Sequence, residues 1–292
     1  MCATGLTARF EQQRPQLKAL AYRMLGTLTD AEDAVQEAWI RLHRADAEHV
    51  DNLAAWLTTV VARICLNMLR ARHARRDEDL LAQLPDPIVD PVGASDPEHQ
   101  ALLADSVGLA LFVVLETLPP PERLAFVLHD VFALPFDQIA PIVERSPVAT
   151  RQLASRARRR IQAAHPTPDG DMAAQRAVVD AFFAAGRSGD FDRLVAVLHP
   201  DVELRGDFGP GRTTSARGAT TVAKLAKAYA GLDNDVRAAA VNGAAGAVVL
   251  RSGRPMSIMA FLVAAGTVRA IDVLADPDRI ARLDLAAVLD RT

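Results

Sequence analysis

Cysteine and aromatic residues are scarce in this chain. Of its 292 residues only two are cysteines, and 5% are aromatic. Cys2 lies at the terminus and Cys65 lies within a helical pattern, so the sequence excludes both a disulfide framework and a zinc cluster. We therefore expect a reducing, cytoplasmic setting, with no metal ion and no cofactor.

A signal peptide and long apolar runs are also missing. The first ten residues, MCATGLTARF, contain no apolar core of the kind that a signal peptide needs. Apolar runs such as 259–265 are too short to cross a bilayer, so no membrane association is expected. Half of the residues are nevertheless apolar, which is enough for two or three domains with buried cores.

The net charge of −3 hides an asymmetry between two parts of the chain. Residues 1–171 contain 18 Lys and Arg against 23 Asp and Glu, whereas residues 172–292 contain 15 against 13. Bulk charge thus argues against indiscriminate nucleic-acid binding. Any contact with DNA must come from local clusters of basic residues.

One such cluster lies in residues 146–161, SPVATRQLASRARRRI. Ser146 is suited to cap a helix, and Pro147 fits its first position. The buried stripe consists of Leu153, Ala157 and Ile161. A short link separates this helix from an apolar segment at 134–143, which predicts a helix-turn-helix. Pro141 falls inside the first of the two helices, so we expect that helix to be kinked or short.

Residues 145–168 contain six arginines and no acid. The polar side of the second helix is suited to contact phosphates and base edges. Its residues are Arg151, Gln152, Ser155, Arg156 and Arg159. The alternative interpretation is a solvated basic face, which is common on isolated Arg-rich helices. The tight turn before the helix favours the DNA-binding interpretation.

A second basic helix is predicted at 53–76, where no acid occurs. Its basic face consists of Arg63, Arg70, Arg72, Arg75 and Arg76, with Asn67 among them. Arginines at a fraying helix end are common, but Arg63 and Asn67 lie a turn or more inside. We also predict helices at 7–26 and 30–45. In the latter, Glu32, Asp33 and Glu37 either compensate the helix dipole or form a docking face for a basic partner.

Residues 77–98 contain seven acids, no base and four prolines, and we expect a linker without helix or strand. Asp96 then caps a helix that ends at Pro119, and a further helix is expected at 122–132. After a short linker at 165–171, two helices precede an antiparallel meander. We expect its strands at 202–205, 236–241, 247–251, 256–263 and 268–274, with turn signals at 242–243, 252–253 and 265–266.

Residues 6–164 resemble the extracytoplasmic-function (ECF) group of bacterial RNA polymerase sigma factors. The resemblance rests on four segments in the order typical of that family: 30–42 (DAEDAVQEAWIRL), 55–76 (AWLTTVVARICLNMLRARHARR), 118–131 (LPPPERLAFVLHDV) and the ending RQLASRARRRI. It implies that core RNA polymerase and promoter DNA are partners. The sequence departs from the commoner family pattern at Pro141, Pro147 and Leu153.

The resemblance also implies a role for each cluster. Glu32, Asp33 and Glu37 would dock on the polymerase. Arg63, Asn67, Arg70 and Arg72 would engage and melt the minus-ten promoter element. Arg151, Gln152, Ser155, Arg156 and Arg159 would read the minus-thirty-five element in the major groove.

Residues 172–292 resemble the SnoaL-like α+β cone that is fused behind the helix-turn-helix in a subgroup of these sigma factors. In that subgroup the cone regulates the sigma factor in place of a separate inhibitor. Three further segments resemble the subgroup: the linker sequence at 84–87, the loop at 207–212 and the terminal sequence at 276–280. We expect the regulatory contact to involve Pro85, Pro87, Asp207, Gly209, Gly211, Arg212, Asp276, Pro277 and Asp278, and to favour a compact state.

The expected fold is therefore multidomain, with two all-α sigma domains followed by an α+β SnoaL-like cone. The expected boundaries are 1–76, a linker at 77–98, 99–164 with the helix-turn-helix, a linker at 165–171, and 172–292. We expect no enzyme, because the cone offers only His199, Tyr229 and scattered acids. A small-molecule ligand in the cone remains open. The rival is a one-component regulator in which such a ligand controls a helix-turn-helix that binds DNA alone.

Overall fold

The computed structural model describes residues 2–45, 52–75, 84–93, 108–164, 168–228 and 234–290. They belong to two compact units. The first unit contains helices α1–α3 and α6–α8, and the second contains the linker at 84–93, the β-sheet and helices α9–α13. The division falls within α5 (Gly108–Thr117).

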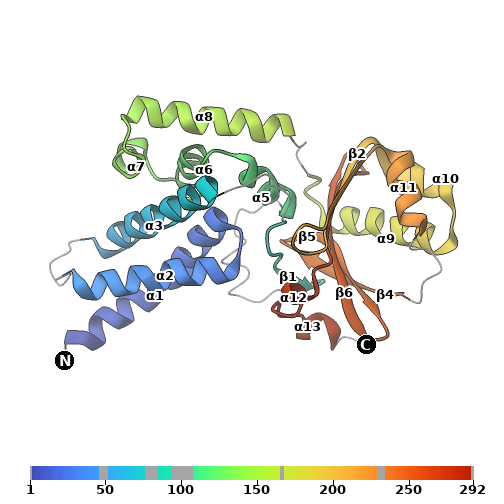
Figure 1. Ribbon diagram of the computed structural model, residues 1–292, viewed down its shortest axis with the longest axis horizontal. Helices are drawn as coiled ribbons and strands as arrows, with labels where there is room; N and C mark the ends of the chain where they lie inside the picture. Colours follow the sequence, from blue (N-terminus) through green and yellow to red (C-terminus); the bar gives the residue numbers. More distant parts are fainter. Residues whose placement is uncertain are drawn as a thin grey trace. The chain divides into compact units, whose positions relative to one another are not determined.

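In the first unit, α1 (Cys2–Leu25), α2 (Leu28–Arg44) and α3 (Leu53–Arg75) pack against one another (Figure 1). The hydroxyl of Thr27 caps α2 by accepting from the amide of Asp30. The buried stripe of α2 consists of Ala31, Ala34, Val35, Ala38 and Leu42, at the spacing of an amphipathic helix. Among the described residues, one stretch, in α3, is long and apolar enough to cross a membrane, but 44% of it is buried, as in many core helices.

The rest of the first unit consists of α6 (Pro120–Phe126), a π turn η3 (Val127–Val131), α7 (Phe136–Val143) and α8 (Pro147–Ala164). The helix expected at 122–132 is present, since the backbone stays right-handed helical at Phe126 and Val127, but its last turn widens into the π turn. Pro141 lies inside α7, which is only eight residues long, as expected. Glu144 ends α7 in the left-handed region, and Ser146 caps α8 through the amide of Ala149, 3.2 Å away.

Arg123 on α6 is a buried cation in the core of the first unit. Its side chain is 2% exposed. Nε and Nη2 donate to the carbonyl oxygen of Arg23 at the end of α1, at 3.1 and 2.9 Å, and Nη1 pairs with Glu116 at 2.7 Å. A cation at the C-terminal end of a helix is stabilised by the helix dipole. Arg123 therefore joins α6 to α1 within this unit.

The second unit is a seven-stranded sheet in the order β1-β4-β5-β6-β7-β2-β3, with helices beside it (Figure 1). Its strands are β1 (Val89–Pro91), β2 (Leu198–Asp207), β3 (Thr213–Arg217), β4 (Asn234–Val241), β5 (Ala244–Arg251), β6 (Arg254–Ala264) and β7 (Thr267–Leu274). Its helices are α9 (Met172–Ser188), α10 (Phe191–Val197), α11 (Ala219–Ala228), α12 (Pro277–Ile280) and α13 (Ala286–Leu289).

The expected meander is present from β4 to β7. Each of its three hairpin turns has two residues with positive φ, as the paired turn signals predicted; in the first, Asn242 and Gly243 lie at 49° and 77°. Two features were missed. The first is a set of elements that were not expected, namely strand β3 and helices α11 and α13. The second is the pairing of β7 with β2, which is parallel rather than antiparallel.

The expectation that the linker forms no strand was also wrong. Residues 89–91 form β1, which pairs antiparallel with β4 at the edge of the sheet. Pro91 is tolerated because an edge strand needs ladder bonds on one side only. The acids at 77–79 and the helix start at 96–98 lie outside the described residues.

The core of the second unit lies on one face of the sheet. Phe182 of α9, Leu194 of α10 and Val222 of α11 pack there against Phe261 and Ile271. Burial of each such side chain stabilises a fold by about 1.5–3 kcal/mol. The three helices cover this face, and the linker joins the sheet at its β4 edge.

Candidate nucleic-acid interface and linker site

Helix α8 has one buried face and one solvent-exposed face. Thr150, Ala154 and Ala157 are fully buried against the preceding helices. Gln152 and Arg159 lie on the opposite side, where both are exposed, and Ser155 between them is partly exposed. Positions 152, 155 and 159 follow helical i, i+3, i+7 spacing and therefore share one face. The face is free of acids along the whole helix.

The arginines beside this face form ion pairs with acids of the first unit. Arg156 and Arg160 both pair with Glu122 of α6, at 2.8 and 3.1 Å. Glu122 is only 7% exposed, whereas the side chain of Arg156 remains 44% exposed. Arg158 pairs with Asp130 at 2.6 Å. These contacts orient the guanidinium groups without burying them. Glu122 and Asp130 were not predicted as site residues, because the sequence around them indicates only a helix.

Arg151 extends over the ring of Phe136, with its guanidinium carbon 5.4 Å from the ring centroid. Phe136 begins α7 and itself stacks on His129. Such a cation–π contact orients the side chain but leaves hydrogen-bond donors of the guanidinium available at its edge. Arg151 is exposed and therefore lies beside the outward face of α8.

Helix α3 contains a second exposed polar face, made of Arg63, Asn67 and Arg70. All three are exposed and follow i, i+4, i+7 spacing. The guanidinium of Arg63 also lies 3.5 Å from the carbonyl oxygen of Pro141 in α7. Like the α8 face, this face combines basic groups with a side-chain amide. Its cationic groups are suited to nucleic-acid phosphates.

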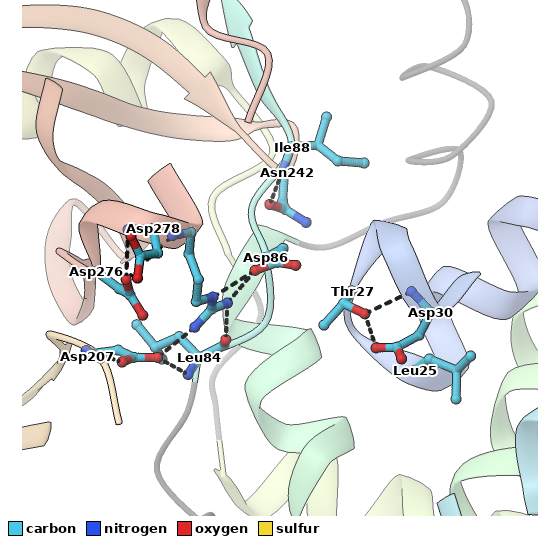
Figure 2. A network of polar contacts seen from close by, with 12 residues as sticks. Leu25, Thr27, Asp30, Leu84, Asp86, Ile88, Asp207, Asn242, Asp276 and Asp278 are labelled. Carbon is cyan, nitrogen blue, oxygen red and sulfur yellow. Dashed lines mark hydrogen bonds and ion pairs between the residues drawn. The ribbon is translucent and has the colours of Figure 1, made fainter. Parts of the chain in front are cut away.

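Arg72 does not belong to this face, although sequence reasoning grouped it there. It lies nine residues after Arg63, which places it on the opposite side of the helix. Its guanidinium pairs with Asp30 at 2.5 Å and donates to the carbonyl oxygen of Leu25 at 3.0 Å. Figure 2 shows Leu25, Thr27 and Asp30 together at the turn between α1 and α2. Arg72 therefore connects α3 to the turn between α1 and α2. The side chains of Arg75 and Arg76 are not among those that the structure describes.

Besides Asp30, α2 has three acids, and these differ in their surroundings. Glu32 pairs with Arg14 and with Lys18, the latter at 3.4 Å. Partial burial opposes ionisation of Glu32, but the Arg14 hydrogen bond and the charge of Lys18 outweigh it and hold its pKa below the ordinary value. Glu37 pairs with Arg41 at 2.8 Å, one turn along the helix. Asp33 is exposed to solvent between them.

In the second unit, the linker is bound to the domain by a cluster of charged groups around Arg279 of α12. Nε of Arg279 donates to Asp86 at 2.8 Å, Nη1 to Asp207 at 2.6 Å, and Nη2 to the carbonyl oxygen of Leu84 at 2.6 Å. Asp207 is fully buried and also accepts from the amide of Leu84, at 3.0 Å. Figure 2 shows Leu84, Asp86 and Asp207 converging on this point. We call these four residues the Arg279 cluster.

A second contact binds the linker two residues after Asp86. The side-chain oxygen of Asn242 accepts from the amide of Ile88 at 3.0 Å (Figure 2), and the amide of Asn242 donates to the Ile88 carbonyl oxygen at 2.8 Å. Asn242 is fully buried in the turn between β4 and β5. Leu84, Ile88 and Val89 are buried as well. The linker is thus held by apolar burial, by the Arg279 cluster and by Asn242.

The expected regulatory residues lie at different distances from the linker. Pro85 and Pro87 are buried, and Asp207 contacts the linker directly. Gly209 donates to Asp207 and packs so closely on Asp276 that an added Cβ would lie 3.2 Å from its carboxylate. Four positions are exposed: Gly211, Arg212, Pro277 and Asp278.

Asp276 caps α12 through the amides of Asp278 and Arg279, and Asp278 itself is exposed. Arg279 lies within the terminal sequence at 276–280 but was not predicted as a site residue, and neither were Asp86 and Asn242. A lone arginine in that terminal sequence, set against a linker rich in acids, was the available signal.

The candidate catalytic residues of the cone are not brought together. Asp272 is buried, and this burial raises its pKa despite the hydrogen bond from Arg205. The neighbouring Ile271 points into the apolar core, and because side chains alternate along a strand, Asp272 points to the other face of the sheet. Asp201 is exposed, and Asp207 belongs to the Arg279 cluster. The side-chain nitrogen of His199 accepts from the amide of Asp201. Tyr229 lies outside the described residues.

Two family models match the chain. Residues 9–75 match the model described as Sigma-70 region 2, and residues 109–161 match the model described as Sigma-70, region 4. The first contains α2 and α3 with their acidic and basic residues. The second contains α6–α8, including the helix-turn-helix.

Similar proteins cover two thirds or more of the chain. The ECF RNA polymerase sigma factor SigJ of Mycobacterium tuberculosis is 40% identical over 288 residues, which cover 93% of this chain and 92% of SigJ. The probable ECF RNA polymerase sigma factor SigI of the same species is 39% identical over 199 residues, covering 68% of each chain. The crystal structure of SigJ superposes with a TM-score of 0.75 at 36% identity and covers 96% of this chain and 99% of that chain. The expected multidomain fold, with helical sigma domains followed by an α+β domain, is confirmed.

Proposed function

Because this chain belongs to the ECF RNA polymerase sigma factors, we propose that it selects promoters through the two exposed polar faces on α3 and α8. Both faces combine cationic groups with a side-chain amide, and they lie on separate helices within the two sigma regions. That separation is the observation on which the proposal rests. A single basic face would fit any helix-turn-helix protein, whereas two faces fit two promoter elements.

The α8 face reads the minus-thirty-five element. Gln152 is suited to an adenine edge and Arg159 to a guanine edge or a phosphate, with Arg151 and Arg156 positioning the helix on the backbone. The double substitution Arg151→Ala/Arg156→Ala should weaken transcription that depends on this element and leave binding to core polymerase unchanged. Arg187→Ala, at an exposed arginine of α9, is the matched control. Loss of polymerase binding in the double variant would contradict this assignment.

The α3 face engages the minus-ten element through Arg63, Asn67 and Arg70. Arg72 lies on the other side of the helix in an ion pair, so we assign it a structural role instead. Arg70→Ala should reduce open-complex formation, measured with a fluorescent base placed in the minus-ten element. A normal open-complex yield with this variant would argue against the α3 face.

The acidic face of α2 contacts core polymerase, with Asp33 as its most available carboxylate. Glu32 and Glu37 are partly neutralised by basic residues of the same module. Asp33→Lys should therefore weaken binding to core polymerase more than Glu37→Lys does. Equal binding of both variants and wild type in a pull-down with core polymerase would exclude this docking face.

The C-terminal unit modulates the sigma activity by holding the linker. The linker joins the two sigma regions, so its capture by the Arg279 cluster and by Asn242 restrains their placement. Asn242→Gly removes the side chain but keeps the positive φ of the turn. The double variant Arg279→Met/Asn242→Gly should release the linker and raise promoter-specific transcription. An unchanged output, despite a released linker, would exclude this form of regulation.

The rival function is a one-component regulator that binds an operator without polymerase. We also propose that the cone has no catalytic role, because its candidate acids and His199 are dispersed. The discriminating experiment compares run-off transcription with core polymerase and a gel shift with duplex DNA alone. Our proposal predicts specific transcripts and weak binding to the duplex. Tight, specific duplex binding without polymerase would favour the rival.

A further inference from the structure

Val148 is an apolar side chain in an unusual position. It lies in the first turn of α8, two residues after the Ser146 cap, and its side chain is 64% exposed. Among the large apolar residues that the structure describes as exposed, it is the most exposed: the others range from 37% to 44%. Single exposed apolar residues are common on protein surfaces, so the exposure alone assigns no role.

The direction of the side chain supplies the second observation. Positions 148, 152, 155 and 159 follow i, i+4, i+7, i+11 spacing, so Val148 extends the outward stripe of Gln152, Ser155 and Arg159. The buried stripe of Thr150, Ala154 and Ala157 lies on the opposite side of the helix. Val148 thus forms the N-terminal end of the face that the proposed function assigns to DNA.

The position in the motif identifies the kind of contact. In a helix-turn-helix, the N-terminal residues of the second helix contact base edges in the major groove. A thymine presents its C5-methyl group there, and small apolar side chains are suited to contact that methyl. Arg145 and Arg151 flank Val148 in the sequence and are exposed, so phosphates can be neutralised on either side of it.

We propose that Val148 contacts the C5-methyl group of a thymine in the minus-thirty-five element and so contributes to sequence selection. The inference rests on the proposed role of the α8 face. The helix rises about 6 Å between Val148 and Gln152, and bases are spaced by about 3.4 Å along a strand. The thymine therefore lies within about two base pairs of the base that Gln152 reads.

The contact can be tested by removing each methyl group separately. The full chain is assembled with core polymerase on a promoter identified by transcription start mapping, and each thymine of the minus-thirty-five element is replaced in turn by deoxyuridine. Loss of one buried methyl contact should weaken binding roughly threefold to fivefold at one or two of these positions. At the same positions, Val148→Ala should weaken binding by a similar factor with thymine and show no further loss with deoxyuridine.

Two controls separate this inference from the proposed function. Leu225→Ala removes an apolar side chain from α11 that is 38% exposed, and it should leave the response to deoxyuridine unchanged. If promoter-specific transcription is absent altogether, the proposed function fails. If transcription is specific but the losses from Val148→Ala and deoxyuridine multiply independently, or no thymine replacement matters, the Val148 contact is refuted. Folding is not at issue, because Val148 is exposed and alanine favours a helix.

Discussion

Substitution of Arg279 by methionine tests how the linker is held. The guanidinium of Arg279 bonds to Asp86, Asp207 and the Leu84 carbonyl oxygen. Methionine fills a similar volume but cannot pair with the buried carboxylate of Asp207. Removal of one partner from a buried ion pair generally costs about 3–5 kcal/mol. Asp207 keeps two backbone donors, the amides of Leu84 and Gly209 at 3.0 Å each, so the lower end of that range applies.

The rest of the linker contact is of comparable strength. Leu84, Ile88 and Val89 are all buried, and each contributes about 1.5–3 kcal/mol, which is an upper estimate. Arg279→Met should therefore loosen the linker at Leu84 without releasing the Ile88 end, which Asn242 still binds. A local loss of about 3 kcal/mol corresponds to roughly hundredfold faster hydrogen exchange.

Hydrogen exchange of the two amides is the assay. We predict that the Leu84 amide exchanges roughly a hundredfold faster in Arg279→Met than in wild type, while the Ile88 amide changes much less. Arg282→Met is the matched control, because Arg282 is an exposed arginine three residues further along. Unchanged protection of Leu84 in Arg279→Met, or an equal effect in Arg282→Met, would refute the assignment of the Arg279 cluster as the linker's anchor.

Three further predictions concern the first unit. Burial raises the pKa of Cys65 to about 12, so in a Cys2→Ser background iodoacetamide at pH 8 should label Cys65 only as fast as the protein unfolds; fast labelling of folded protein would contradict this. The pKa of Glu32 is lowered in the folded state, so its ion pairs stabilise the fold above the unfolded pKa and this stability is lost as pH falls through the folded pKa. Glu32→Gln should thus cost about 0.2–1 kcal/mol in urea unfolding at pH 7 and nothing below both pKa values, and a pH-independent difference would count against it. Arg72→Ala should lower the free energy of unfolding by about 1–2 kcal/mol, whereas Arg70→Ala should not. Equal losses in the two variants would contradict the different roles assigned to Arg72 and Arg70.

Helix caps and tight turns could be predicted from the sequence, because they are determined by residues that are close together in the chain. The Ser146 cap, the proline at the start of α8 and the paired turn signals between β4 and β7 act over a few residues, so their structure could be predicted. The exposed stripe on α8 followed from helical periodicity. Arg72 was grouped with Arg63 and Arg70 by composition, although its nine-residue spacing from Arg63 already places it on the opposite side of the helix.

Contacts between distant parts of the chain could not be predicted from local patterns. Arg279 and Asp86 are 193 residues apart, and either would be an ordinary surface charge without the other. Strand β1 was missed because the prolines of the linker argued against a strand, although a strand at the sheet edge tolerates them. Glu122 was missed for a similar reason: its partners lie on α8, and only the fold brings them to α6.

Site-specific crosslinking of one promoter complex tests the central claim most directly. A photoreactive amino acid is introduced at Asn67 in one variant and at Gln152 in another, and each is assembled with core polymerase on the same mapped promoter. We predict that the Asn67 probe crosslinks to the minus-ten element and the Gln152 probe to the minus-thirty-five element, both only when polymerase is present. Crosslinking of both probes to one element, or equal crosslinking without polymerase, would contradict the account.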